Sequence, residues 1–295
     1  MANSSRGPSV GIVTVAYRSN KVLGGFLDSI AAASADPVAV VVADNLPGSG
    51  DASALAAAAG AVHVPVPGNP GYGGAVNAGV RALPDSVEWV LISNPDVVLA
   101  PGAIDALRAT GASDPAIAAI GPAVLNPDGS VYPSARAVPS LRTGVGHALF
   151  ANLWQRNPWT LAYRRETDPS DVSRDAGWLS GSCLLVRRSA FDAIGGFDEG
   201  YFMYFEDVDL GFRFSRAGYR NVYEPAASVT HVGAHSTGSE SARMVEAHHA
   251  SARRFLSKKY VGWYLWPIRA GLAVGLWVRS RAITRRLKRD GAAPL

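Results

Sequence analysis

Residues 38–45 read Val-Ala-Val-Val-Val-Ala-Asp-Asn, an apolar and β-branched run that stops at two polar side chains. Such a run predicts a strand that is buried on both faces. Similar runs alternate with Ala-rich or amphipathic segments from residue 10 to residue 120. We expect strands at 10–16, 38–43, 62–66, 89–93 and 117–120, and helices near 23–34, 51–59, 74–83 and 101–110. This alternation predicts an α/β fold with a mostly parallel central sheet flanked by helices.

Three of the predicted strands run directly into polar or Gly-rich loops. The first loop holds Asp44 and Asn45, the second is Gly-Asn-Pro-Gly at 68–71, and the third is Asn-Pro-Asp at 94–96. In open α/β sheets, ligands bind at the carboxyl ends of the strands. We therefore expect these loops to converge on one binding site.

Composition indicates a globular, intracellular protein. The chain has 295 residues, 48% of them hydrophobic and 18% charged, which is enough to bury a substantial core. Its one cysteine, Cys183, allows no internal disulfide and favours a reducing compartment. The N-terminus lacks the apolar run of a signal peptide, so we expect a cytoplasmic location. The formal net charge of +4 arises from a basic stretch at 279–289, and nothing indicates binding to nucleic acid or a particular oligomeric state.

The second half of the chain has a different character. Asn-Pro-Asp-Gly at 126–129 predicts a hairpin-like turn, and the Pro-, Trp- and Arg-rich stretch 132–175 predicts an irregular excursion over the site. Trp154 and Trp159 there, and Trp178 after it, are candidates for an acceptor sugar site or for buried core. An apolar strand at 183–186 and a helix beginning at Glu206 follow. We expect a catalytic domain at 1–238, with a nucleotide-binding part at about 10–125 and an acceptor-side part at about 126–238, and a helical basic segment at 239–295.

Two aspartates at strand ends suit nucleotide and metal chemistry. Asp44 is placed to accept a hydrogen bond from a nucleobase imide N–H, or else to cap the next turn. Asp96 is placed to hold a divalent cation that neutralises a diphosphate, or else to cap the following helix. The Gly-rich segment 69–77 is neither a Walker A nor a G-x-G-x-x-G motif, so we expect close backbone approach to a ligand or to a neighbouring helix.

A second acidic group lies at 206–209. Glu206, Asp207 and Asp209 stand at a predicted helix N-terminus, where the helix dipole alone explains one or two acids. The aromatic run 201–205 before them predicts a wall for a sugar pocket. His231 follows another apolar segment and is either a metal ligand or a structural histidine.

Taken together, these motifs resemble glycosyltransferase family 2 in order and spacing over residues 10–235. The matching motifs are Asp44-Asn45, Asn69-x-Gly-Tyr-Gly-Gly-Ala-x-Asn77-x-Gly79, Asn94-Pro95-Asp96, Gly181 to Arg187, Glu206-Asp207-x-Asp209-Leu210-x-x-Arg213 and His231. The resemblance implies a GT-A type nucleotide-sugar-binding fold and an inverting glycosyltransferase. One departure is Asn94, because the family's metal motif often has an aspartate there.

A narrower resemblance concerns the segments 132–136, 156–159, 177–188 and 235–238. They are similar to the enzymes that move L-rhamnose from dTDP-L-rhamnose to polyprenyl-diphosphate-linked N-acetylglucosamine in the arabinogalactan linker of the actinobacterial cell wall. The alternatives left open are a family 2 enzyme with another nucleotide sugar or a polysaccharide acceptor, a nucleotidyltransferase, and a non-catalytic binding protein.

The resemblance also implies a role for each matching residue. Asp207 is the general base, and Asp96 and His231 are ligands of Mg²⁺ or Mn²⁺. The expected donor site consists of Tyr17, Asp44, Asn69, Gly71, Asn94 and Asp96. The expected sugar and acceptor site consists of Trp178, Ser180, Gly181 and Glu206.

The C-terminal segment has the composition of a membrane-surface anchor. Aromatic residues cluster at 262–269 beside a proline and an arginine, and the apolar run at 270–278 is shorter than the roughly 20 residues that cross a bilayer. The basic stretch 279–289 suits anionic lipid. We expect this segment to lie peripherally on the inner face of the cell membrane, or alternatively to form an amphipathic helix packed on the catalytic domain.

Overall fold

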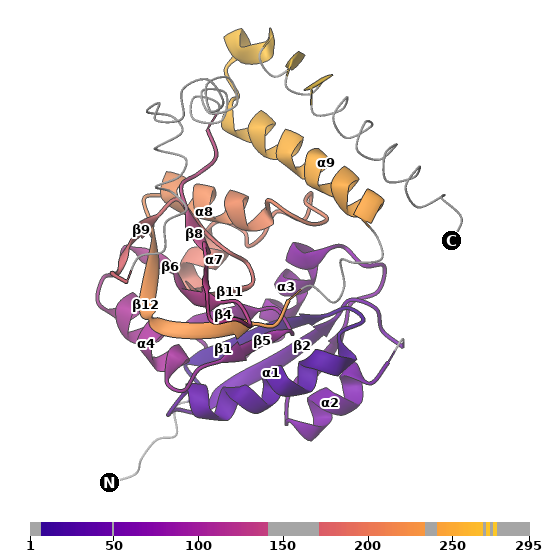
Figure 1. Ribbon diagram of the computed structural model, residues 1–295, viewed down its shortest axis with the longest axis vertical. Coiled ribbons are helices and arrows are strands. Elements are labelled where there is room, and N and C mark those ends of the chain that lie inside the picture. Colours follow the sequence, from indigo (N-terminus) through magenta and orange to yellow (C-terminus); the bar gives the residue numbers. More distant parts are fainter. Residues whose placement is uncertain are drawn as a thin grey trace.

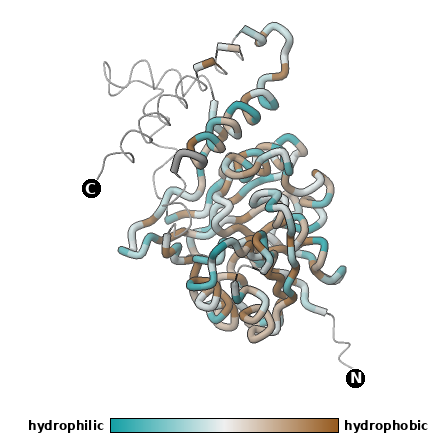
Figure 2. The backbone as a smooth tube through the Cα atoms, turned by 90° about the vertical axis from the view of Figure 1, so that its right-hand side faces the viewer, coloured by the Kyte–Doolittle hydropathy of each residue, from teal (hydrophilic) through white to brown (hydrophobic). Residues whose placement is uncertain are grey.

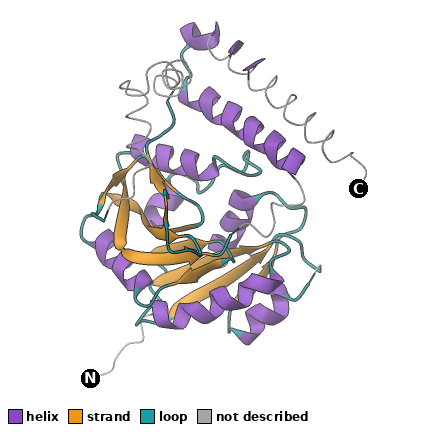
Figure 3. Ribbon diagram, viewed as in Figure 1, coloured by secondary structure: helices purple, strands orange, loops and turns teal. Residues whose placement is uncertain are grey.

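The centre of the protein is a mixed, mostly parallel sheet with helices on both faces, as Figures 1 and 3 show. The computed structural model describes residues 7–48, 50–140, 171–233, 241–267, 270–271 and 274–275. The strands are β1 (Val10–Ala16), β2 (Val38–Asp44), β3 (Val62–Pro65), β4 (Trp89–Ser93), β5 (Val97–Leu99), β6 (Ile117–Leu125), β7 (Val131–Tyr132), β8 (Ala135–Arg136), β9 (Arg174–Ala176), β10 (Trp178–Leu179), β11 (Cys183–Arg187) and β12 (Arg220–His231). The helices are α1 (Asn20–Ala33), α2 (Ala52–Ala58), α3 (Tyr72–Arg81), α4 (Ala103–Ala112), α7 (Arg188–Ala193), α8 (Glu206–Arg216), α9 (Ser241–Lys259) and the 3₁₀ turn η1 (Trp263–Leu265).

The main strand order is β3-β2-β1-β4-β11-β6-β12-β5. The first four strands are parallel to one another, and β12 is parallel to β6. Strand β11 runs antiparallel to both β4 and β6, and β5 runs antiparallel to β12. The nucleotide half predicted from the alternating pattern is therefore a parallel sheet, and β11 joins it to the second half.

The two faces of the sheet carry separate hydrophobic clusters. On one face, Ile12 and Leu91 pack against Phe26 of α1 and Leu107 of α4. On the other face, residues of α3, α7 and α8 cover the sheet, and Phe214 of α8 is fully buried there. Since β1 is buried along its whole length, its sequence reads as a continuous apolar run without alternation.

All five predicted strands and all four predicted helices of the first half are present, with shifted ends. The strand predicted at 117–120 continues to Leu125 as β6, and α3 begins at Tyr72, two residues before the expected start. Strand β5 was not predicted, because three residues are too short to give a periodic signal. It forms by pairing with β12, a contact between segments far apart in the chain.

The hairpin-like turn predicted at 126–129 is confirmed. It joins β6 to β7, and the Asn126 N–H donates to the Ser130 carbonyl at 2.8 Å. Strands β8 and β10 then form a small separate sheet. Trp154 and Trp159, the segment 235–238 and the basic stretch 279–289 lie outside the described residues.

Helix α9 lies across α8, at the end of the molecule opposite α1 and α2 (Figure 1). Its sequence alternates polar and apolar residues, visible as alternating teal and brown in Figure 2. Phe255 is fully buried, with its ring centroid 5.7 Å from Phe205 and 5.6 Å from Phe212. The start of the predicted 239–295 segment is thus packed on the second half of the α/β body.

Ion pairs fix α9 in addition to this apolar contact. Arg254 donates to both carboxylate oxygens of Asp198, and Lys258 pairs with Asp198 and with the fully buried Asp209 of α8. Asp209 also accepts from Arg213 at 2.6 Å. Arg254, Lys258, Asp198 and Arg213 are partly exposed, so the network's strength comes mainly from the buried Asp209. Among the described residues, no helix is long and apolar enough to cross a bilayer.

Candidate active site

The predicted donor residues meet at the carboxyl edge of the parallel strands. Tyr17 follows β1, Asp44 ends β2, Asn69 follows β3, and Asn94 follows β4. The register pairs Ala16 with Asp44, which places the ends of β1 and β2 side by side. The convergence expected from the three loops is therefore present in the structure.

Asp44 is buried and already holds two partners. Its Oδ1 accepts from the Leu46 N–H at 3.0 Å, which is the turn-capping arrangement considered from the sequence. Its Oδ2 lies 3.1 Å from His63 Nε2. Each carboxylate oxygen has a second lone-pair site, so this capping leaves capacity for a ligand N–H. His63 was not predicted, because its place beside Asp44 comes from the pairing of β3 with β2.

The Gly-rich loop after β3 packs against the segment that precedes α8. Asn69 has a left-handed backbone with φ 47°, and its Oδ1 accepts from Asn45 Nδ2 at 2.9 Å. Gly71 has φ 91°, and a Cβ there would collide with the backbone carbonyl of Phe202. The expected close approach is thus made to a neighbouring backbone, and it ties the donor edge to the second half of the chain.

Asp96 and His231 are brought together by β5 and β12. His231 is paired with Val97 in the register, and the Val232 N–H donates to the Asp96 carbonyl at 2.9 Å. As a result His231 Nε2 lies 3.1 Å from Asp96 Oδ1. Two neighbouring ligands of an octahedral cation with bonds of about 2.1 Å also lie about 3 Å apart, so the pair fits a divalent cation. Within the described residues, no cluster of three or more His, Cys, Asp or Glu side chains has the form of a metal site.

Asp207 is the second residue of α8 and faces the turn between β10 and β11. Its Oδ2 accepts from the Gly181 N–H at 3.0 Å, and its Oδ1 accepts from the Val208 N–H at 2.8 Å. Burial raises the pKa of Asp207 above its usual value of 3.8, and the hydrogen bonds from the backbone offset only part of that rise. A carboxylate with a raised pKa is a stronger base.

Glu206 lies beside Asp207 and is buried, with an exposed fraction of 8%. Its Oε2 has no hydrogen-bond partner among the described residues. Burial, and then the charge of Asp207, raise its pKa from 4.5 to about 8. At neutral pH Glu206 is therefore mainly protonated, and a protonated carboxyl donates a hydrogen bond.

Tyr72 joins the parts of this site and was not predicted as a site residue. Its hydroxyl donates to the Gly181 carbonyl at 2.7 Å. Burial raises the pKa of Tyr72 well above 10, and the negative charges of Glu206, Asp207 and Asp96 raise it further. The charges of Asp96 and Asp207, which lie on separate elements, therefore both raise the pKa of the Tyr72 hydroxyl. The sequence feature that could have indicated Tyr72 as a site residue is its position inside the Gly-rich loop.

The candidate acceptor residues lie on and after β10. Trp178 Nε1 donates to the Ala137 carbonyl at 3.0 Å, and the residue packs against Gly211 of α8. The Ser180 hydroxyl lies 3.0 Å from the Ser182 hydroxyl, and the Ser182 carbonyl accepts from the Asn94 N–H at 2.8 Å. Trp178, Ser180 and Gly181 thus connect α8 with the end of β4.

The predicted aromatic wall at 201–205 is wrong for Tyr201. This side chain is fully buried, and its hydroxyl lies 3.3 Å from Asp209 Oδ1. It cannot line a pocket, because it forms core beneath α9. Asp209 likewise belongs to the ion-pair network with Arg213 and Lys258, and not to the group at the helix N-terminus.

Strained backbone borders the same site. Within the described residues, the non-glycine residues with positive φ are Arg18, Asn69, Tyr204 and Phe205. Two follow strands of the donor edge, and two directly precede Glu206. Strain of this kind costs on the order of 1–3 kcal/mol per residue and clusters at functional sites.

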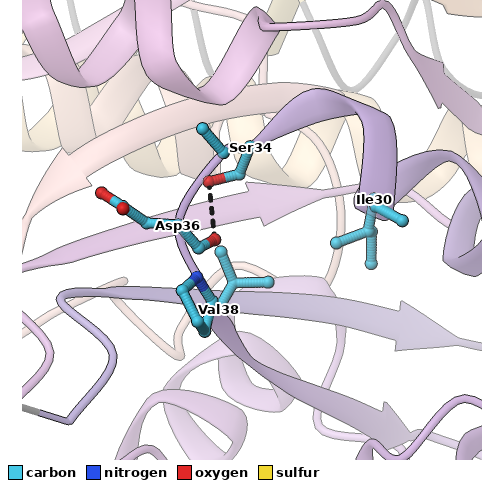
Figure 4. A pocket seen from close by; sticks show the side chains of 7 residues that line it. Ile30, Ser34, Asp36 and Val38 are labelled. Atoms are coloured by element: carbon cyan, nitrogen blue, oxygen red, sulfur yellow. Dashed lines mark hydrogen bonds between the residues drawn. The ribbon is translucent and has the colours of Figure 1, made fainter. Parts of the chain in front are cut away.

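One shallow hollow, of about 340 Å³, lies elsewhere. It is lined by Ile30, Ser34, Asp36 and Val38, at the end of α1 and the start of β2, where the Ser34 hydroxyl donates to the Asp36 carbonyl at 3.0 Å (Figure 4). This is the amino end of β2, whereas the candidate site lies at its carboxyl end. The hollow carries none of the predicted site residues.

Comparisons with known proteins show which family the chain belongs to. The family described as glycosyltransferase-like family 2 matches residues 8–251. The chain is 47% identical over 287 residues to the N-acetylglucosaminyl-diphospho-decaprenol L-rhamnosyltransferase of Mycobacterium tuberculosis, covering 93% of this chain and 92% of that protein. It is 43% identical over 97 residues to the rhamnosyltransferase WbbL of Escherichia coli, covering 33% of this chain and 36% of that protein.

Among solved structures, a mannosyltransferase from Pyrobaculum calidifontis in complex with GDP-Man and Mn²⁺ aligns with a TM-score of 0.58 at 15% identity. The alignment covers 99% of this chain and 77% of that chain. At this identity the likeness concerns the fold alone, and it confirms the predicted GT-A type architecture.

Proposed function

Because this chain belongs to glycosyltransferase-like family 2 and is a glycosyltransferase, we propose that it transfers L-rhamnose from dTDP-L-rhamnose to a polyprenyl-diphosphate-linked N-acetylglucosamine, with inversion. The observation that carries the proposal is the 47% identity to the mycobacterial rhamnosyltransferase over 93% of this chain. The family match removes the nucleotidyltransferase alternative. The choice of sugar and acceptor rests on this relative.

The proposed reaction is a single displacement. A hydroxyl of the acceptor sugar attacks the anomeric carbon of the donor, its proton passes to Asp207, and the bond from that carbon to the diphosphate oxygen breaks. The leaving group is dTDP. The helix dipole favours the ionised form of Asp207 and burial disfavours it, and the raised pKa indicates that burial dominates. The raised pKa makes Asp207 a stronger base toward the acceptor proton.

The donor nucleotide is proposed to bind along the edge formed by β1 to β4. Tyr17 is half-buried and follows Ala16, which is paired with Asp44, and its ring would stack on the base. Asp44 would accept the thymine imide N–H with a free lone pair. Asn69 and Gly71 shape the loop, and Asn94 and Asp96 stand at the end of β4 near the diphosphate.

Asp96 and His231 are proposed to hold Mg²⁺ or Mn²⁺. The Asp96–His231 distance of 3.1 Å supports this assignment. A bound divalent cation neutralises the negative charge that develops on the leaving diphosphate. Since Asn94 is neutral, the diphosphate and water would supply most of the other ligands.

The acceptor sugar is proposed to lie over Gly181, between Asp207 and the β10 residues Trp178 and Ser180. Glu206 supports this placement, because its Oε2 has no partner among the described residues and its carboxyl group can donate a hydrogen bond in the protonated form.

We further propose that the enzyme works on the inner surface of the cell membrane. Residues 239–295 would be the membrane-surface segment, with α9 attaching it to the catalytic domain at 1–238. After α9 the side chains of Trp263, Tyr264 and Trp266 are 83%, 66% and 62% exposed. Exposed aromatic residues of this kind suit the headgroup region. Because a lipid-linked acceptor lies at the membrane surface, this attachment would bring the active site close to it.

Two measurements test the donor and cation proposals. A thermal-shift screen of nucleoside diphosphate sugars should give the largest stabilisation with dTDP-L-rhamnose, and equal response to other nucleotides would remove the donor assignment. In calorimetry, Asp96→Ala should remove the cation dependence of dTDP binding, and His231→Ala should weaken it less. Unchanged affinity in both variants would make the pair structural.

The membrane proposal has its own test. Full-length protein should sediment with anionic vesicles and release at high salt, and the double variant Trp263→Ser/Trp266→Ser should bind less. Val62→Ser is the control, since Val62 is 52% exposed on β3. Equal loss in the control and the double variant would contradict the proposed contact.

A further inference from the structure

Arg136 on β8 is a cation held in a fixed orientation. Its Nε donates to the Pro133 carbonyl at 2.8 Å. The guanidinium carbon lies 5.5 Å from the centre of the Tyr132 ring and 5.8 Å from that of the Trp178 ring. Stacking on aromatic rings limits the motion of the guanidinium, so its remaining N–H groups are preorganised for a ligand.

The small β8–β10 sheet places Arg136 next to the proposed base. Arg136 is paired with Trp178 in the register, and Trp178 packs on Gly211 of α8. The chain then continues from β10 to Gly181, whose N–H binds Asp207. The charge of Arg136 reaches Asp207 and contributes to lowering its pKa, against the larger effect of burial.

Within the described residues, no carboxylate pairs with Arg136. Arg188, Arg213, Arg220 and Arg254 each pair with an aspartate there. A half-buried cation without a counter-charge is unfavourable unless a ligand supplies the charge. A guanidinium group is planar and can donate two parallel hydrogen bonds, which matches the oxygens of a phosphate group.

The proposed reaction offers two diphosphates, one in the donor and one in the acceptor. The donor residues lie at the ends of β1 to β4, whereas Arg136 lies on β8. From Arg136 the chain runs toward the end of α9, where Lys259 donates to the Pro139 carbonyl at 2.6 Å. The exposed residues Trp263 and Trp266 follow directly. The segment that holds Arg136 is thus in contact with the turn beside Asp207 at one end and with the end of α9, just before the proposed membrane contact, at the other.

We infer that Arg136 binds the acceptor diphosphate and so selects acceptors that carry one. This inference rests on the proposed function for the presence of a diphosphate acceptor. It assigns Arg136 to substrate binding and leaves proton transfer to Asp207.

The test measures direct binding of farnesyl diphosphate to the full-length protein with the donor site filled by saturating dTDP. Arg136→Gln should weaken binding roughly 10- to 100-fold, the range expected for charged hydrogen bonds. Arg136→Lys should weaken binding of farnesyl diphosphate less than Arg136→Gln does, because lysine keeps the positive charge but cannot form the two parallel hydrogen bonds of a guanidinium group. The control is Arg174→Gln, since Arg174 also stacks on an aromatic ring, Tyr223, and binds the Ala135 carbonyl of β8. It should change binding less than about threefold.

Other outcomes overturn the inference. If Arg136→Gln and Arg174→Gln weakened farnesyl diphosphate binding equally, the cause would be a disturbed β8. If Arg136→Gln weakened dTDP binding and left farnesyl diphosphate binding unchanged, Arg136 would belong to the donor site. If Arg136→Gln fails to fold, an unchanged affinity in Arg136→Lys overturns the inference as well. A wild-type protein that binds farnesyl diphosphate through Arg136 but does not use dTDP-L-rhamnose would contradict the proposed function and leave this inference standing.

Discussion

Replacing Asp207 by asparagine removes the proposed base while nearly keeping the shape of the side chain. In the native structure both carboxylate oxygens accept from backbone N–H groups, of Gly181 at 3.0 Å and of Val208 at 2.8 Å. Asparagine has one oxygen, so its amide nitrogen must face one of these two donors. The lost hydrogen bond costs about 1–3 kcal/mol, partly offset because a neutral amide is easier to bury than a carboxylate. Asp207→Asn should therefore fold, with a Tm lower by a few degrees at most.

The effect on turnover should be much larger than the effect on folding. Loss of a general base lowers kcat on the order of 100- to 10,000-fold, or about 3–5 kcal/mol in the barrier. Affinity for dTDP should change less than about threefold, because Asp207 acts on the acceptor side. The assay combines steady-state transfer with calorimetry of dTDP, and Asp192→Asn, at an exposed aspartate on α7, is the control. If kcat stayed within about threefold of the wild type, or if dTDP affinity fell as much as kcat, the base assignment would be refuted.

Further predictions concern stability and pH. In wild-type protein, kcat/KM should fall as pH decreases through the raised pKa of Asp207, and a pH-independent rate from pH 8 to 4 would contradict its role as base. Glu206→Gln should raise Tm relative to the wild type increasingly between pH 5 and 8. In that range the unfolded wild type releases the Glu206 proton while the folded protein, with a pKa raised to about 8, retains it, so the wild type loses stability as pH rises; a constant difference would refute the burial argument. Gly71→Ala should destabilise the fold by at least about 2 kcal/mol in denaturant titration, since φ 91° and the close backbone carbonyl both oppose a Cβ. Lys258→Met should cost about 1–2 kcal/mol more than Arg253→Met, an exposed cation on the same helix, and equal costs would show that the network contributes little.

The parts of the site that lie at strand ends were predictable from the sequence. Apolar runs ending at Asp44 and before Asn94 show where strands stop, and parallel strands bring such ends to one edge. The close backbone approach at Gly71 was also predictable, although not the identity of its neighbour. These features depend on local pattern and on one rule of topology.

Features that depend on long-range pairing were not predictable. The pairing of β5 with β12 places His231 beside Asp96, and the pairing of β3 with β2 places His63 beside Asp44. Asp209 gave the same sequence signal as Asp207, an acid in the first turn of a helix. Their tertiary contacts distinguish them, because Lys258 of α9 and Arg213 of α8 bind Asp209, whereas Asp207 accepts from the Gly181 N–H.

The central claim is the transfer of rhamnose to a lipid-linked amino sugar, and its most direct test is a single reaction. Purified full-length protein is incubated with radiolabelled dTDP-L-rhamnose, polyprenyl-diphospho-N-acetylglucosamine and Mg²⁺ or Mn²⁺, and the lipid fraction is analysed for a labelled disaccharide. We expect a rhamnosyl-N-acetylglucosaminyl lipid that forms with the wild type and not with Asp207→Asn. A wild-type protein that leaves the lipid unlabelled, or labels it equally well from UDP- or GDP-linked sugars, would contradict the claim.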